Sequence, residues 1–134
     1  MLHTKTVPIY KGEVKMEGTL CFVEIDAERY EIEVTLDGAR FFGRGDDYFD
    51  AMIEARKQLE ASGLLLGIYG ASRNVWPSPM SRSMGEGIKA YRMTMGRQAL
   101  SKDLVHIFDS GPDVLPSTIA EQEAYKNAWF DSLG

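Results

Sequence analysis

Few side chains in this sequence have the chemistry of a metal ligand or a nucleophile. The chain has two histidines, His3 and His106, in different segments, and one cysteine, Cys21. A zinc or iron site needs several such ligands at workable spacing, and a disulfide needs a second cysteine, so we expect no metal, no disulfide and no cofactor. Cys21 falls in the apolar run 20–23 and is expected to be a small buried residue. The strand pattern around His106 favours a hydrogen-bonded structural histidine, with an acid or base role as the alternative.

Serines and glycines also give weak signals for catalysis. Three serines crowd the segment 78–83, but no Gly-x-Ser-x-Gly elbow accompanies them. The run 43–45 before a helical pattern resembles a phosphate-binding turn, but Asp46 and Asp47 put negative charge where the phosphate would lie. These patterns favour a protein without enzymatic activity.

The segment 71–87 has an unusual composition for a connection between two predicted strands. It runs for 17 residues, longer than most loops in compact domains, and such loops are often functional. Trp76 and Met80 supply apolar contacts, while Arg73 and Arg82 supply forked cationic donors. We expect either a recognition surface or a lid that covers the chain's own core.

Charge is spread unevenly along a chain whose net charge is −5. The segment 71–102 has six basic residues and one acidic residue, whereas 24–37 has six acidic residues and one basic residue. Such runs are usually solvated faces, but Glu28, Glu31 and Glu33 form a second candidate contact surface. The sequence pI of about 5.0 argues against nucleic-acid binding.

The segment 64–91 resembles a family of small bacterial proteins without assigned activity. Members share the pattern Ala-Arg-Arg-x-Val-(Tyr/Trp)-Pro-Ser-x-Met, then Met-Gly-x-Gly and Ala-Tyr. The chain matches this pattern from Ala71 to Tyr91 but has Ser72 where the family usually has arginine. The similarity continues through 103–108 and the start of the last helix, and covers about half of the chain. Some relatives are encoded near Rhs-type or contact-dependent toxins, so the resemblance implies an immunity protein that neutralises a toxin by binding it.

The first third of the chain predicts β-structure. Apolar residues alternate with polar ones over 30–36, the run 20–25 is similar, and the polar residues 26–29 between them predict a hairpin. Further strands are predicted at 7–16, with a turn at Glu17 and Gly18, and at 39–42.

Helical periodicity begins after Asp46 and Asp47, either of which can cap the N-terminus, and Gly63 predicts the end of this helix. A second helix is predicted after the capping box of Thr118 and Glu121, docked through Tyr125 and Trp129. The remaining strands are predicted at 64–69, which should be central in the sheet because it has almost no polar face, at 88–95 and at 104–108.

These elements predict one α+β domain over residues 1–134, with a largely antiparallel sheet of about five or six strands and two helices packed on it. The longest uncharged apolar stretch, 61–72, is too short to span a membrane, and residues 1–5 lack the features of a secretory signal. We therefore expect a cytoplasmic protein.

Two classes of function fit the sequence. The first is a non-enzymatic protein-binding factor, most concretely an immunity protein for a bacterial toxin, with Arg73, Trp76, Met80 and Arg82 or the acidic hairpin as the contact surface. The second is a small-molecule site or small enzyme under 71–87, where Arg73, Arg82 and Arg92 would hold an anionic ligand. In the second case, pairing of these arginines with the chain's own carboxylates would count against the site. A homodimer formed through 71–87 is a third possibility.

Overall fold

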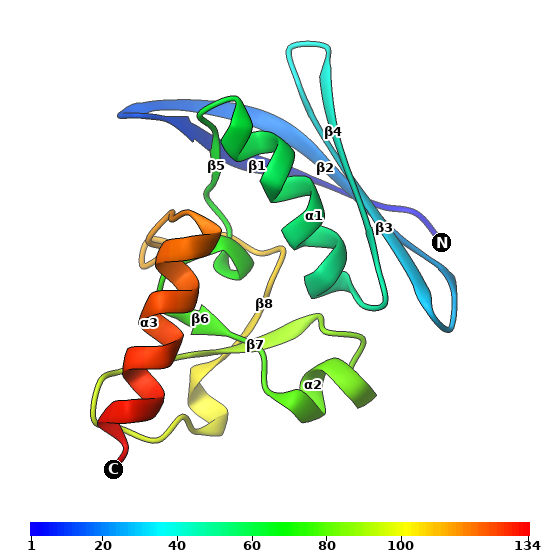
Figure 1. Ribbon diagram of the computed structural model, residues 1–134. Coiled ribbons are helices and arrows are strands. Elements are labelled where there is room, and N and C mark those ends of the chain that lie inside the picture. The colour runs from blue at the N-terminus through cyan, green and yellow to red at the C-terminus, as the bar shows by residue number, and fades with distance from the viewer.

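The computed structural model describes residues 1–134, and its N-terminal half is built around an antiparallel β-sheet (Figure 1). Four strands follow one another along the chain, and a short fifth strand pairs with the first, which gives the order β4-β3-β2-β1-β5. In the third strand, Tyr30, Ile32, Val34 and Leu36 are buried in alternation with half-buried polar residues, as predicted. The strands are β1 (His3–Lys11), β2 (Val14–Asp26), β3 (Arg29–Leu36), β4 (Ala39–Gly45) and β5 (Leu65–Leu66).

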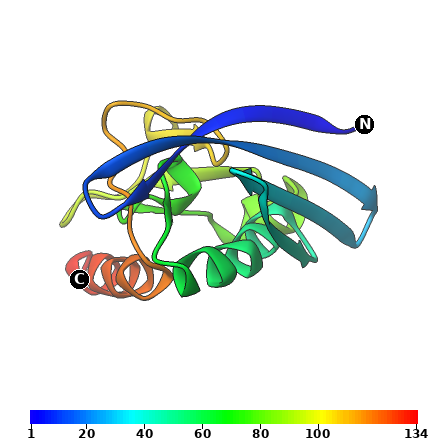
Figure 2. The same cartoon turned by 90° about the horizontal axis from the view of Figure 1, so that it is seen from above.

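Helix α1 (Tyr48–Ala61) packs against one face of this sheet, which curls around it (Figure 2). Its N-cap is Asp47, whose side chain accepts a 2.7 Å hydrogen bond from the backbone N–H of Asp50. The helix stops just before Gly63, which adopts a φ of +73°. The predicted start and end of this helix are therefore confirmed.

Helix α1 lies directly on the backbone of β4, and a glycine makes this approach possible. A Cβ atom at Gly43 would lie 1.9 Å from the carbonyl oxygen of Ala51, well inside van der Waals contact. The absence of a side chain at this position therefore sets how closely the helix and strand pack.

A second sheet of three strands lies beneath the first one in Figure 1. It is antiparallel, in the order β6-β7-β8, and its strands are short. Helix α2 follows the first of these strands, one short 3-10 turn precedes the sheet in the chain, and a second lies between β7 and β8. The elements are η1 (Tyr69–Ala71), β6 (Val75–Trp76), α2 (Pro79–Met84), β7 (Lys89–Arg92), η2 (Ser101–Asp103) and β8 (Leu104–His106).

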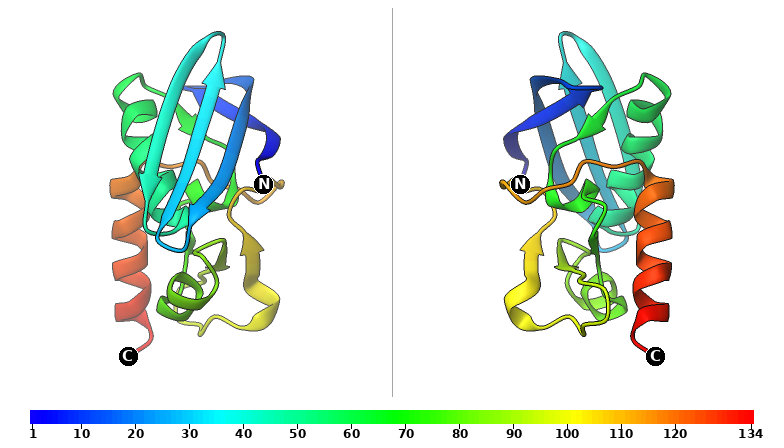
Figure 3. Two further views of the ribbon diagram at one scale, coloured as in Figure 1. Left: turned by 90° about the vertical axis from the view of Figure 1, so that its right-hand side faces the viewer. Right: turned by 90° about the vertical axis from the view of Figure 1, so that its left-hand side faces the viewer.

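The C-terminal helix α3 (Ile119–Ser132) begins at the predicted capping box and runs along the flank of the second sheet (Figure 3). The Tyr125 hydroxyl donates a 3.0 Å hydrogen bond to the carbonyl of Met93. The indole N–H of Trp129 lies 3.0 Å from the carbonyl oxygen of Thr94 and 2.9 Å from that of Arg97. Docking through Tyr125 and Trp129 is thus confirmed, although the docking surface is the second sheet and its connection.

A buried polar cluster joins α3 to α1 and to the second sheet. Gln122 is fully buried, and its side-chain oxygen accepts a 2.5 Å hydrogen bond from Arg56 of α1. Its amide nitrogen donates to the carbonyl oxygens of Gly70 and Val75 at 2.9 and 2.7 Å. Arg56 also donates to the carbonyl of Ser117 at 2.9 Å. Burial lowers the pKa of Arg56 to about 10, and the negative charge of Glu60 only partly opposes this shift.

The fold class is α+β with antiparallel pairing, as predicted, but the strands form two sheets of five and three instead of one. The prediction that 64–69 forms a central strand is wrong, since β5 is a two-residue edge strand. The backbone turns at η1, where Tyr69 and Gly70 donate to the carbonyls of Asp109 and Ile107. This segment is buried by neighbouring chain segments and not by strands on both sides.

Three local predictions also differ from the structure. The turn expected at Glu17 and Gly18 lies instead at Gly12, which has a φ of +60°. Gly18 is within β2, where its missing side chain leaves room for Ile9. Cys21 is half-buried on the outer face of the sheet, because its neighbours in β2 face the core and the period of two turns it outward. The segment 71–87 contains β6 and α2 and is not an irregular loop.

Candidate functional site

An open groove lies between β6, β7 and the C-terminal half of α3. Its volume is about 690 Å³, and aromatic and aliphatic side chains form most of its surface. Two cationic residues, Arg82 and Lys126, also line it, and no carboxylate does. The main apolar lining residues are Trp76, Tyr91, Met93, Trp129, Phe130 and Leu133.

Trp76 connects this groove to the rest of the fold. It is half-buried on β6, and its ring packs edge-on against Phe49 of α1 at 5.0 Å between ring centres. The ammonium of Lys126 on α3 lies 4.5 Å from the centre of the Trp76 ring, within cation–π distance. The tryptophan predicted from the sequence as either a recognition residue or a packing anchor therefore serves as an anchor and also lines an open groove.

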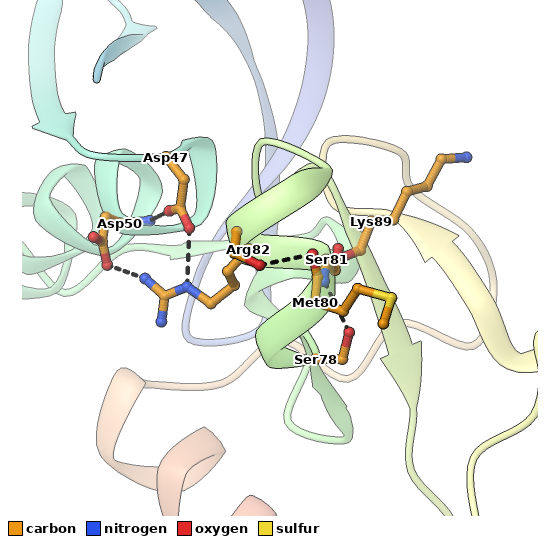
Figure 4. A network of polar contacts seen from close by, with 8 residues as sticks. Asp47, Asp50, Ser78, Met80, Ser81, Arg82 and Lys89 are labelled. Carbon is orange, nitrogen blue, oxygen red and sulfur yellow. Dashed lines mark hydrogen bonds and ion pairs between the residues drawn. The ribbon is translucent and has the colours of Figure 1, made fainter. Parts of the chain in front are cut away.

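Arg82 holds α2 against the start of α1 (Figure 4). Its Nε donates a 2.9 Å hydrogen bond to Asp47, and its Nη2 forms a second contact with Asp50. The guanidinium also lies over the ring of Phe49 at 5.4 Å. The Ser78 hydroxyl accepts a 3.0 Å hydrogen bond from the N–H of Ser81 and caps α2. The helix that borders the groove is thereby fixed at both its start and its middle.

Arg73 and Met80 lie outside the groove. The exposed Arg73 places its guanidinium 5.9 Å from the ring centre of Tyr125. Met80 is 70% exposed on α2. The structure thus brings together two of the four predicted residues of this segment, Trp76 and Arg82, and leaves the other two on the adjoining surface.

The acidic residues predicted as a second surface do not reach the groove. Glu31 pairs with Arg44 of β4 at 2.8 Å, and Glu33 lies 3.9 Å from Arg40. Glu28 is exposed in the turn between β2 and β3. The arginines of β4 therefore neutralise much of the acidic character that the sequence of β3 suggests.

The three arginines expected to hold an anion do not form one site. Arg82 pairs with Asp47 and Asp50, while Arg92 pairs with Asp113 at 2.7 Å. Only Arg82 of the three lines the groove. Because carboxylates of the same chain already neutralise Arg82 and Arg92, the anion site predicted from these arginines is not assembled.

His106 has the structural role that its strand pattern predicts. Its Nδ1 accepts a 3.1 Å hydrogen bond from the backbone N–H of Phe108. Burial is the main cause that lowers the pKa of His106 below its ordinary value. His3 stacks on Phe22 at 4.8 Å between ring centres. The structure contains no cluster of three or more metal-ligating side chains, and none of its helices is long and apolar enough to cross a membrane.

The comparisons with known proteins give no family for this chain: no protein-family model matches it, and a search of curated proteins finds no similar sequence.

Several groove residues escape prediction from the sequence. Lys126 and Phe130 on α3 and Leu133 at its C-cap lie at helical spacing, but only Tyr125 and Trp129 are singled out by the docking pattern. The adjacent pair Trp129 and Phe130 is the available sequence signal, because neighbouring residues of a helix face different directions and only one of them can dock. The structure buries Trp129 and leaves Phe130 56% exposed. An aromatic residue that remains exposed beside a buried one can indicate a surface for a partner.

Proposed function

We propose that this chain is a non-enzymatic protein-binding factor, most concretely an immunity protein that neutralises a cognate bacterial toxin. The observation that carries the proposal is the groove beside α3, where aromatic side chains from β6, β7 and α3 line an open apolar surface. Protein interfaces are enriched in tryptophan, tyrosine, phenylalanine, methionine and arginine, and the groove contains each of these. The sequence resemblance to proteins encoded near toxins is the reason for proposing a toxin as the partner.

The framework of the groove supports a binding role, because hydrogen bonds within the chain hold residues of its walls in place. Trp129 is held by hydrogen bonds to the carbonyls of two residues, and Arg82 ties α2 to α1. Phe130 and Leu133 project from this framework and are 56% and 40% exposed. A preformed surface loses less conformational entropy on binding, which favours tight association.

The face of the hairpin is the weaker of the two candidate contact surfaces. Two of its three glutamates already pair with arginines of β4, so only Glu28 among them has no basic partner. Charge attraction to a basic partner would therefore be smaller than the sequence of β3 suggests. The groove face is accordingly the surface that we assign to the toxin.

A second candidate function is the binding of a small molecule. The volume of the groove, about 690 Å³, falls within the range of small-molecule sites, and most of its lining is apolar with a few polar groups. An apolar ligand fits this lining better than the anionic ligand expected from the sequence.

The experiment that tests the proposal is growth protection. Each toxin encoded beside the gene is expressed in a sensitive bacterium together with the wild-type chain, Phe130→Ala or Phe42→Ala. Phe42 is the matched control, since it is a 40% exposed aromatic residue on β4, outside the groove. We expect protection by the wild type and Phe42→Ala, and reduced protection by Phe130→Ala at equal protein levels.

Two results would count against the proposal. If the wild-type chain protects against none of these toxins, the immunity function is wrong. If saturating amounts of a small apolar ligand bind the purified chain while no toxin does, the second candidate function replaces it.

A further inference from the structure

The apolar surface of the groove continues into a basic one. A second cavity of about 350 Å³ adjoins it, and Gln98 lines both. Arg97 and Lys102 line this second cavity. Together with Lys126 of the groove, they place three cationic side chains along the surface of the two adjoining cavities, which we call the basic path.

None of these three cations has a carboxylate partner in the chain. The ion pairs of the structure involve other basic residues, such as Arg82 and Arg92. The carboxylate of Asp103, which also lines the second cavity, already accepts a 2.9 Å hydrogen bond from the backbone N–H of Leu100. The positive charge of this path is therefore available to a partner.

The groove surface formed by Trp129, Phe130 and Leu133 provides apolar contacts and no free hydrogen-bonding groups on its side chains. The only polar atom of Trp129, its indole nitrogen, is already bonded to backbone carbonyls. Phe130 and Leu133 add purely apolar surface. A ligand that covers this surface must present apolar groups to it and carry its charges where they face the cations.

The groove residues contributed by α3 and its C-cap lie on one side of the helix. Lys126 and Phe130 on α3 and Leu133 at its C-cap follow one another at intervals of four and three residues, so they form a stripe of about 10 Å. A stripe of this length accommodates an amphipathic helix of a partner, whose apolar anchors recur every three or four residues.

Resting on the function proposed above, we infer that the groove receives an acidic amphipathic segment of the partner protein. Its apolar side chains lie on Trp76, Trp129 and Phe130, and its carboxylates face Lys126, Arg97 and Lys102. A segment of polypeptide fits better than a small molecule, because it can cover both cavities and pair with cations at both ends of the path. Charge complementarity thus selects the chemistry of the occupant.

The two tryptophans of the chain, Trp76 and Trp129, both line the groove, so intrinsic fluorescence reports directly on its occupation. The probe is a short peptide of leucine and glutamate, with leucines at helical spacing and no aromatic residue. Its counterpart carries glutamine in place of every glutamate. We expect a saturable change in tryptophan emission with the glutamate peptide, binding at least about fivefold weaker with the glutamine peptide, and weaker binding of the glutamate peptide at high salt.

Variants of groove residues distinguish this inference from nonspecific hydrophobic binding. Lys126→Gln should weaken binding of the glutamate peptide about threefold to fivefold but leave the glutamine peptide unaffected. Phe130→Ala should weaken both peptides, by about tenfold. The matched controls are Lys11→Gln, an exposed lysine at the end of β1, and Phe42→Ala, and neither should change binding.

The inference is overturned if both peptides bind equally or if neither binds. It fails separately from the proposed function. Should a toxin bind while Lys126→Gln and Phe130→Ala leave its affinity intact, the chain is an immunity protein that uses another face. Should the glutamate peptide bind as described while no toxin does, the groove has the predicted chemistry and the immunity function is wrong.

Discussion

The guanidinium of Arg82 in α2 lies 2.9 Å from the carboxylate of Asp47, the residue that caps α1 (Figure 4). The Asp47 carboxylate thus caps the start of α1 and also holds α2 in place, although Asp47 and Arg82 are far apart in the sequence. The segment predicted to be an irregular loop is held in place by this contact.

Removing this contact should destabilise the protein. We expect Arg82→Ala to lower the free energy of unfolding by about 1–2 kcal/mol, because Asp47 is buried and loses a charged hydrogen bond while the arginine is partly exposed. Urea denaturation followed by circular dichroism measures the change. Arg44→Ala, which removes an exposed ion pair with Glu31, is the control and should cost less than about 0.5 kcal/mol. Equal effects of the two variants would contradict the structural role of Arg82.

Gln122 should be the most sensitive polar position of α3. Gln122→Ala leaves Arg56 without one of its partners and leaves two backbone carbonyls without the amide that donates to them. Such buried groups are costly to leave unpaired, so we expect a loss of about 2–4 kcal/mol in urea denaturation. The exposed Asn127 on the same helix provides the control. A loss below about 1 kcal/mol for Gln122→Ala would show that water replaces these bonds.

Protonation of His106 should oppose folding. Burial lowers its pKa below the ordinary value of 6.5, so the unfolded chain binds this proton more readily than the folded chain. The free energy of unfolding should therefore fall as the pH drops from about 7 through the ordinary histidine pKa of 6.5. The ion pair between Lys5 and Asp109 breaks only at lower pH, since hydrogen bonding to Lys5 lowers the pKa of Asp109 below 3.8.

The variant His106→Asn isolates this effect, because asparagine can place an oxygen where Nδ1 accepts from Phe108 and does not titrate in this range. We expect its stability to depend less on pH than that of the wild type, as measured by thermal unfolding at a series of pH values. Parallel pH profiles for the two proteins would assign the dependence to other groups.

Local patterns in the sequence predict the local structure well. The alternation in β3, the N-cap at Asp47 and the capping box at Thr118 depend on neighbouring residues, and the structure confirms all three. Gly18 shows the limit of this reasoning. Its position looks like a turn, but it lies in a strand because the side chain of Ile9 needs the space.

The groove depends on contacts between distant parts of the chain, and this explains why the sequence predicts only part of it. Trp76 and Arg82 attract attention by their types and spacing. Lys126 and Phe130 become groove residues only because Trp129 docks on the carbonyls of Thr94 and Arg97, far away in the sequence. Periodicity within α3 contains no information about that contact.

Isothermal titration calorimetry of the purified chain with its cognate toxin is the most direct test of whether the groove beside α3 is the binding face. We predict that Phe130→Ala weakens the affinity by about tenfold or more, because an exposed aromatic residue at the groove is the type that dominates interface energies. Phe42→Ala should bind as the wild type does. Unchanged affinity for Phe130→Ala, in a protein that circular dichroism shows to be folded, would contradict the assignment of the groove.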